Sequence, residues 1–247
     1  MRPGAMWGKF PKRSPSGKPA ASIGERQRDL LISDFRFYVW RVRRSRLRAE
    51  LHARIANRVA SMMRTGWVVD VGCGPGLLKP HMDSLMKNVR MVGVDIDRRM
   101  LAFARTEFGL EVVQGASSNL PIRDEGATMV VSSASIKDWG NPEQGLAEIV
   151  RVVKPGGRAL IYEFVTKGPA SQPKGFALRY GLVSDLLRRM MASLIQFTVD
   201  DAHRLARTLK GDVEADVGVE TDIGVVRIEI EKHARTPPVV STSGGMQ

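Results

Sequence analysis

The pattern of hydrophobic and polar positions changes its period near residue 65. Before that point, apolar residues recur at four-residue intervals, at Leu47, Leu51, Ile55, Val59 and Met63. This spacing places them on one face of a helix, so we expect one or two helices within residues 25–64. Arg48 would project into this apolar face. After residue 65, short β-branched runs alternate with helix-compatible segments, as in a parallel sheet flanked by helices.

Five of these short runs indicate strands, over residues 67–71, 90–94, 111–114, 128–132 and 158–164. A helix over 200–209 follows, and then two further β-like runs over 213–219 and 225–231, joined by a turn over 220–224. The predicted fold is therefore α/β. It is a Rossmann-like doubly wound sheet, mostly parallel with an antiparallel C-terminal hairpin, preceded by N-terminal helices.

Composition divides the chain into four parts. Residues 1–24 are rich in Pro, Gly, Lys and Ser and predict a basic flexible tail. Residues 25–64 form the basic helical segment, residues 65–235 the α/β domain, and residues 236–247 a second flexible tail.

The excess positive charge lies entirely before the α/β domain. The chain has a net charge of +12, and residues 1–64 alone contain 16 Lys and Arg but only 4 Asp and Glu. Arginines alternate with aromatic residues between Asp34 and Arg48. Such a segment suits contact with the phosphates and bases of a nucleic acid, or with an anionic membrane surface.

Other features exclude several classes of protein. The single cysteine, Cys73, excludes an internal disulfide, and the four histidines show no metal-ligand spacing, so we predict no metal site. No apolar run is long enough to span a membrane, and no secretory signal is recognisable. We therefore expect a cytoplasmic protein.

A glycine-rich loop follows the first expected strand, in the stretch VVDVGCGPGLL over residues 68–78. Asp70 ends the strand, and Gly72, Gly74 and Gly76 follow at alternate positions. Glycine permits unusual dihedral angles and lets a ligand lie against the backbone amides. The next strand ends in Asp95, whose carboxylate is placed to accept hydrogen bonds from the two hydroxyls of a ribose.

These motifs resemble those of class I S-adenosylmethionine-dependent methyltransferases of the type 11 group. Residues 132–142 are also similar to the corresponding region of quinone-biosynthesis methyltransferases, and the Lys-Pro-Gly-Gly turn at 154–157 fits the same pattern. The resemblance implies S-adenosyl-L-methionine as the cofactor. It implies a set of cofactor-binding residues: Asp70, Gly72, Cys73, Gly74, Gly76, Asp95, Ile96, Ala116, Ser117 and Ser133.

One position departs from the family pattern. Ala116 stands where an aspartate usually receives the exocyclic amine of adenine. The resemblance then leaves this contact to the backbone, to water or to Ser117.

The acceptor should bind near residues 132–139, because ligands of doubly wound sheets bind beyond the carboxyl ends of the strands. Methyl transfer needs alignment of donor and acceptor more than it needs a base. If a catalytic base exists, Asp138 is the first candidate and Glu163 the second, although Asp138 could instead stabilise its loop. Lys137 and Trp139 could orient or stack an acceptor, or be a solvated lysine and a packing tryptophan.

Three hypotheses for function follow. The first is methylation of RNA, either rRNA or tRNA, docked by Phe37, Trp40, Arg43 and Arg44 of the basic helix. The second is methylation of a quinone, lipid or other small molecule, with peripheral membrane contact or with the helix serving only as a lid. The third is a non-catalytic, cofactor-binding RNA or assembly factor.

Overall fold

The computed structural model describes residues 35–165, 197–212, 214–222 and 224–235. The two tails expected at 1–24 and 236–247, and the first part of the basic helical segment, lie outside these described residues.

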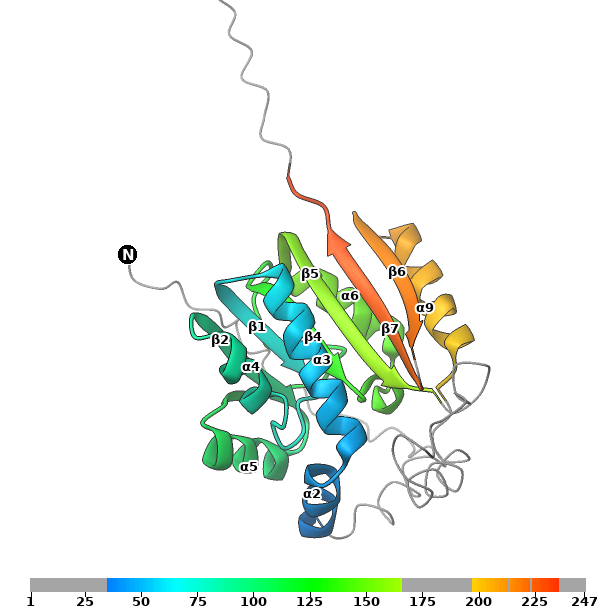
Figure 1. The fold of residues 1–247 in the computed structure, drawn as a ribbon. Helices are drawn as coiled ribbons and strands as arrows, with labels where there is room; N and C mark the ends of the chain where they lie inside the picture. The colour runs from blue at the N-terminus through cyan, green and yellow to red at the C-terminus, as the bar shows by residue number, and fades with distance from the viewer. Residues whose placement is uncertain (1–34, 166–196, 213, 223, 236–247) are drawn as a thin grey trace, which may run out of the picture.

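Seven strands form one sheet in the order β3-β2-β1-β4-β5-β7-β6 (Figure 1). Their bounds are β1 Gly66–Val71, β2 Val89–Asp95, β3 Glu111–Gln114, β4 Ala127–Ser133, β5 Val153–Phe164, β6 Ala215–Asp222 and β7 Val225–Lys232. The first five strands pair in parallel, whereas β7 is antiparallel to both β5 and β6. The predicted fold class is confirmed.

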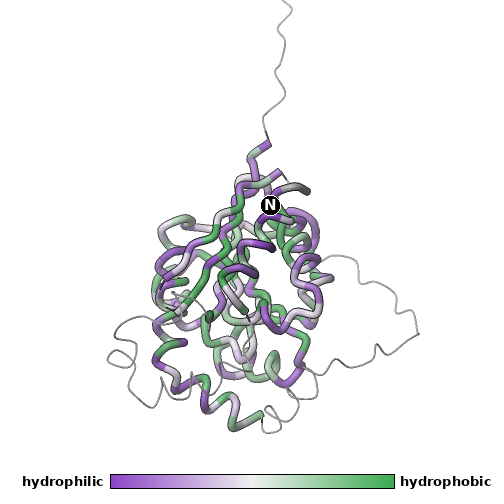
Figure 2. The backbone as a smooth tube through the Cα atoms, turned by 90° about the vertical axis from the view of Figure 1, so that its right-hand side faces the viewer, coloured by the Kyte–Doolittle hydropathy of each residue, from purple (hydrophilic) through white to green (hydrophobic). Residues whose placement is uncertain are grey.

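Helices cover both faces of the sheet. Their bounds are α2 Phe35–Arg43, α3 Arg46–Met62, α4 Lys79–Leu85, α5 Arg98–Phe108, the short 3-10 helix η1 Ile136–Asp138, α6 Pro142–Val152 and α9 Val199–Asp212. One core cluster unites α3, α4 and α5 with one face, and another unites α6 and α9 with the other. Hydrophobic and hydrophilic positions alternate along the helices (Figure 2), as expected where one side of each helix is buried.

The basic segment forms two helices because Ser45 interrupts it. Its hydroxyl accepts a hydrogen bond from the backbone N–H of Arg48 at 3.3 Å and caps α3. Arg48 does reach toward the apolar face, as the sequence predicted, but its guanidinium lies 5.8 Å from the centre of the Phe164 ring. A cation over an aromatic face makes this half-buried position tolerable.

Two boundaries differ from the sequence prediction. The turn expected over 220–224 is shorter, because β6 continues to Asp222 and pairs Glu220 with Arg227. The Lys-Pro-Gly-Gly turn lies inside β5, between the pairs Ala127–Val153 and Met129–Arg158, where the register shifts. Within the described residues, no helix is both long and apolar enough to cross a bilayer.

The contact between α3 and α4 contains a histidine pair, of which His52 is buried. The ring of His52, on α3, lies 5.9 Å from that of His81, on α4. Burial, followed by the charge of Arg48 and then by His81, lowers the pKa of His52 from 6.5 to about 3. Folded His52 is therefore neutral at pH 5, whereas in the unfolded chain it is largely protonated.

We expect this histidine to make the fold sensitive to acid. Because the unfolded chain binds the extra proton, His52 lowers the free energy of unfolding by about 1.4 kcal/mol for each pH unit between about 6.5 and 3. Chemical unfolding at pH 7 and at pH 5 measures this effect. Between these two pH values, the free energy of unfolding should fall by about 2 kcal/mol less in His52→Leu than in the unsubstituted protein. His203→Leu, at an exposed position of α9, serves as the control. Equal losses in all three proteins would contradict the prediction.

Candidate active site

The glycine loop leaves β1 beside the end of β2. The backbone N–H groups of Gly72 and Cys73 both donate to the carbonyl of Val94, at 2.8 and 3.1 Å. Gly72, Gly74 and Gly76 have φ angles of +71°, +53° and +78°, which a residue with a side chain rarely adopts. The loop conformation therefore depends on glycine at all three positions.

The three glycines serve different purposes. A Cβ at Gly72 would lie 2.4 Å from the hydroxyl of Ser135, and one at Gly76 would lie 2.8 Å from the Cβ of Ala104. Only a Cβ at Gly74 would meet open space. From the sequence, we expected all three glycines to let a ligand approach the backbone. In the structure, only Gly74 leaves space for a ligand, whereas Gly72 and Gly76 allow close packing within the protein.

Asp95 links the end of β2 to the glycine loop. Its Oδ2 accepts a hydrogen bond from the N–H of Gly74 at 2.8 Å, and its Oδ1 accepts one from the N–H of Asp97 at 2.9 Å. Each carboxylate oxygen retains capacity for a further donor. Burial raises the pKa of Asp95, and these backbone hydrogen bonds partly offset that effect.

Asp70 is buried beneath the loop. Burial, assisted by the charge of Asp95, raises the pKa of Asp70 to about 7. Its Oδ1 has no hydrogen-bond partner among the described residues. A buried acceptor without a partner is costly unless a ligand or water satisfies it. A cationic ligand with N–H donors suits this position.

Two more of the expected cofactor residues lie next to these acids. The Cys73 thiol is buried against Gly93, because a Cβ at Gly93 would lie 2.6 Å from the Cys73 sulfur. Burial raises the pKa of the thiol well above the usual value. Cys73 therefore offers a ligand only its backbone. Ile96, by contrast, is 67% exposed beside Asp95. Its carbonyl accepts a hydrogen bond from Gln114 at 3.0 Å, a contact that the sequence analysis missed.

The loop after β3 brings Ala116 and Ser117 toward the same edge of the sheet. The N–H of Asn119 donates to the carbonyl of Ala116 at 3.1 Å, which makes a tight turn. The indole of Trp139 packs beside this turn, because a Cβ at Gly145 would lie 2.6 Å from the indole and 3.4 Å from Ser117. Gly145 of α6 thus contacts both Trp139 and Ser117, which belongs to the loop that the sequence proposes for adenine.

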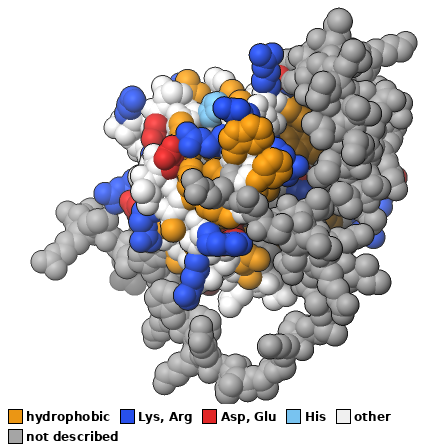
Figure 3. All heavy atoms as spheres, turned by 90° about the horizontal axis from the view of Figure 1, so that it is seen from below, with side chains coloured by type: hydrophobic (Ala, Val, Ile, Leu, Met, Phe, Trp, Pro, Cys, Tyr) orange, Lys and Arg blue, Asp and Glu red, His pale blue; other side chains and the backbone are white. Residues whose placement is uncertain are grey.

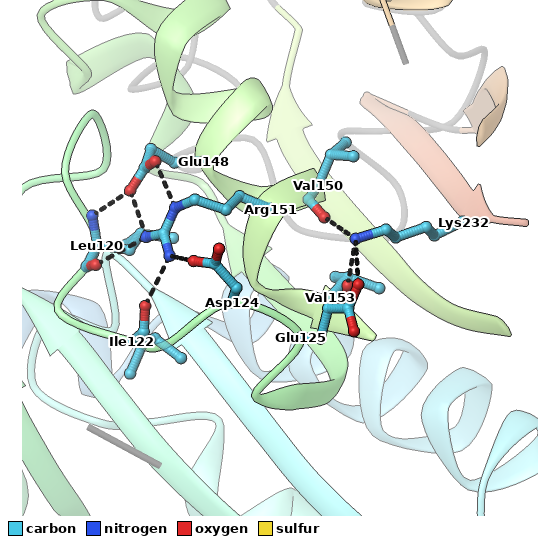
Figure 4. A network of polar contacts seen from close by, with 9 residues as sticks. All are labelled: Leu120, Ile122, Asp124, Glu125, Glu148, Val150, Arg151, Val153 and Lys232. Carbon is cyan, nitrogen blue, oxygen red and sulfur yellow. Dashed lines mark hydrogen bonds and ion pairs between the residues drawn. The ribbon is translucent and has the colours of Figure 1, made fainter. Parts of the chain in front are cut away.

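Arg151 of α6 fastens the continuation of this loop (Figure 4). Its guanidinium donates to the carbonyls of Leu120 and Ile122, to Asp124 and twice to Glu148, at 2.6 to 3.0 Å. Glu148 in turn accepts the N–H of Leu120 at 2.8 Å. These five bonds match the five N–H donors of an arginine. Sequence reasoning missed this network, since its members come from two segments that pattern alone does not connect.

The residues expected near the acceptor meet at the ends of β4 and β5. Glu163 is buried, and Lys137 lies between the two carboxylates, with its Nζ 3.2 Å from Asp138 and 3.5 Å from Glu163. The Nζ also donates to the carbonyl of Ala134 at 2.8 Å. Burial alone would lower the pKa of Lys137, but Glu163 and Asp138 outweigh burial and raise it. Lys137 is therefore a fixed cation.

Helix α2 presents an exposed stack of side chains. The rings of Phe37 and Trp40 lie 5.7 Å apart at an interplanar angle of 22°, and the guanidinium of Arg44 lies 4.8 Å from the Trp40 ring. Phe37 and Trp40 are 55% and 50% exposed. Arg43 points elsewhere, since it forms an ion pair with Glu107 of α5 at 2.9 Å. From below, exposed hydrophobic side chains lie among Lys and Arg (Figure 3).

A groove of about 460 Å³ lies between α3 and the β6–β7 hairpin. Its arginines are already paired with carboxylates: Arg58 with Glu229 at 3.2 Å, Arg227 with Glu220 at 2.6 Å, and Arg54 with Asp222. The pairs of Arg54 and Arg58 fasten α3 to the hairpin, whereas the pair of Arg227 joins β7 to β6.

Comparison with known proteins identifies the domain. Residues 69–161 match a family model described as a methyltransferase domain. The chain contains a methyltransferase domain. This match runs from within β1 to within β5, so it includes all ten of the cofactor residues inferred from the resemblance.

Individual relatives agree with this family. The chain is 27% identical over 121 residues to the uncharacterised methyltransferase YdaC of Bacillus subtilis. The match covers 48% of this chain and 67% of YdaC. The chain is also 34% identical over 99 residues to a demethylmenaquinone methyltransferase of Corynebacterium kroppenstedtii, covering 40% of this chain and 42% of that enzyme.

A solved structure shares the fold of this methyltransferase domain and its flanking helices. A protein of Methanococcus maripaludis, assigned as an S-adenosyl-L-methionine-dependent methyltransferase, superposes with a TM-score of 0.63 and 19% identity. The match covers 91% of this chain and 99% of that one.

S-adenosylmethionine is the cofactor of this class, and the residues present fit it. Gly74 leaves open space against the backbone, Asp95 retains acceptor capacity, and Asp70 has an unpartnered buried oxygen. The ribose hydroxyls of the cofactor suit the carboxylate of Asp95. Its positively charged ammonium and sulfonium suit the buried acid Asp70.

Proposed function

We propose that the protein transfers the methyl group of S-adenosylmethionine to RNA in the cytoplasm, and that α2 docks this acceptor. The exposed stack of Phe37, Trp40 and Arg44 carries the proposal. Flat aromatic and guanidinium surfaces exposed to solvent bind unpaired bases without requiring a particular sequence.

The charge around the stack supports a polyanionic acceptor. Arg41, Arg44 and Arg46 are exposed and form no ion pair with a described carboxylate. Arginines in this state are available to phosphates, and their neutralisation makes binding depend strongly on salt. Arg43, which the sequence grouped with them, instead holds α2 to α5.

The acceptor then reaches the carboxyl ends of β4 and β5. The bound cofactor would supply a methyl group on a positively charged sulfur. This charge already makes the methyl carbon electrophilic. Asp138, whose side chain is 51% exposed, is the better candidate to take a proton from the acceptor. Glu163 accepts the N–H groups of Lys137 and Phe164, so it acts by fixing Lys137, which would orient the acceptor.

Methyl incorporation tests this proposal. The full chain is incubated with tritiated S-adenosylmethionine and total cellular RNA, and label in the RNA is counted at 50 and 200 mM salt. We expect salt-sensitive labelling, and we expect Phe37→Ala with Trp40→Ala to reduce it at least tenfold, because base stacking contributes about 1–3 kcal/mol for each base. Leu85→Ala, at another exposed apolar position, is the matched control.

A quinone is the second candidate acceptor, because the Corynebacterium relative is named a demethylmenaquinone methyltransferase. The same exposed aromatics among arginines would then rest on an anionic bilayer. The assay therefore includes vesicles that contain demethylmenaquinone. Label in the quinone and none in RNA would overturn the RNA proposal, and label in neither would favour a non-catalytic cofactor-binding factor.

A further inference from the structure

Ser135 lies immediately before η1, and its hydroxyl makes three contacts. Its Oγ lies 3.1 Å from the carbonyl of Val71, 2.7 Å from the hydroxyl of Ser132 and 3.2 Å from the indole Nε1 of Trp139. These partners come from the end of β1, the end of β4 and the loop before α6. One small side chain thus joins three segments of the candidate site.

The direction of each hydrogen bond follows from the chemistry of a hydroxyl. A hydroxyl donates one hydrogen bond and accepts two, whereas a carbonyl only accepts and an indole N–H only donates. Ser135 therefore donates to Val71, accepts from Trp139 and accepts from Ser132. All of its hydrogen-bonding capacity is used, which fixes the orientation of every partner.

The backbone around Ser135 is shaped to allow these contacts. Gly72 must lack a Cβ, because that atom would lie 2.5 Å from the Cβ of Ser135. Ala134 has a φ of +55°, a conformation that costs a residue with a side chain about 1 kcal/mol or more. Its N–H donates to the carbonyl of Tyr162 at 2.7 Å, which holds this strained residue against β5.

Each partner leads to a different part of the candidate site. Val71 precedes Gly72, where the cofactor loop begins. The Trp139 indole packs against Gly145, which also contacts Ser117 of the loop expected to receive adenine. Residues 136–138, between Ser135 and Trp139, contain the acceptor-side Lys137 and Asp138.

We propose that Ser135 is a positioning residue that couples the cofactor loop to the acceptor-side turn. A displacement of Val71 when the cofactor binds passes through the Ser135 hydroxyl to the Trp139 indole, and so sets the position of Lys137 and Asp138. This inference rests on the proposed cofactor site and deepens it, but it does not depend on which acceptor is methylated.

Nuclear magnetic resonance tests the coupling in the full chain. The indole N–H signals of 15N-labelled protein are followed during titration with S-adenosylhomocysteine, and Trp139→Phe identifies the signal of Trp139. We expect the Trp139 signal to move on binding, and this movement to vanish in Ser135→Ala while the dissociation constant rises about five- to tenfold. Ser135→Thr, which keeps the hydroxyl, should restore the movement.

Ser61→Ala is the control, because Ser61 is exposed on α3 and, among the described residues, its hydroxyl bonds only the carbonyl of Arg58. An undiminished movement of the Trp139 signal in a folded Ser135→Ala protein would overturn the proposal. If Ser135→Ala does not fold, Trp139→Phe decides, since it removes the indole N–H donor and leaves the Ser135 hydroxyl in place. An unchanged affinity for S-adenosylhomocysteine in that variant would overturn the coupling. A lack of methyl transfer to RNA would overturn only the proposal that RNA is the acceptor, and not the coupling through Ser135.

Discussion

Asp95→Ala should weaken the binding of S-adenosylmethionine about 100-fold. The substitution removes the carboxylate that we expect to receive the ribose hydroxyls, and it also leaves the N–H of Gly74 without its acceptor. A hydrogen bond to a charged group contributes about 1.5–3 kcal/mol, and 100-fold corresponds to about 2.7 kcal/mol. Isothermal titration calorimetry with S-adenosylmethionine and S-adenosylhomocysteine measures the effect.

Asp97→Ala is the matched control for this prediction. Asp97 lies two residues away, but its side chain caps α5 by accepting the N–H of Arg99 at 2.8 Å. Its loss should lower the free energy of unfolding by about 1 kcal/mol and change cofactor affinity by less than threefold. A dissociation constant for Asp95→Ala within threefold of the unsubstituted protein would show that Asp95 does not bind the ribose.

The fold was predictable because its signals are local. Period-four spacing indicated α3, and β-branched runs between turns indicated all seven strands. The errors occurred where pairing between strands overrides local composition. Glu220 and Asp222 are polar enough to suggest a turn, yet they pair with Arg227 and Val225 and extend β6. The bulge at 154–157 likewise depends on the register with β4, which the sequence does not reveal.

The candidate site was predictable only in part, for a related reason. Asp70 and Asp95 lie in the last two residues of their strands and the three glycines follow β1, so a strand-by-strand analysis finds them. Ser135 and Arg151 act across segments, and neither has an unusual local sequence. The separate purposes of Gly72 and Gly74 also depend on a distant neighbour, since only the fold places Ser135 against Gly72. A signal that was available is the run of small residues at 132–135, three of them serines, which is unusual at the end of a buried strand.

Arg151→Met should be the most destabilising of the substitutions considered. Methionine keeps much of the side-chain volume but offers none of the five N–H donors. The carbonyls of Leu120 and Ile122 would lose their side-chain donors, and the carboxylate of Glu148 would lose its cation. We expect the free energy of unfolding to fall by about 2–4 kcal/mol, since each half-buried group left unpaired costs about 1–3 kcal/mol. In a chain of this size the melting temperature should fall by about 5–12 °C.

Thermal and urea unfolding followed by circular dichroism measure this loss. Arg204→Met provides the comparison, because Arg204 is exposed on α9 and forms one ion pair, with Asp201 at 3.0 Å. An exposed pair of this kind contributes less than about 1 kcal/mol. Arg151→Lys should recover little, because an ammonium cannot reproduce the planar arrangement of donors that reaches two carbonyls and two carboxylates together. Arg151→Met could instead prove no less stable than Arg204→Met. The loop of residues 115–124 would then be held by the packing of its own buried side chains, Leu120 and Ile122, and not by Arg151.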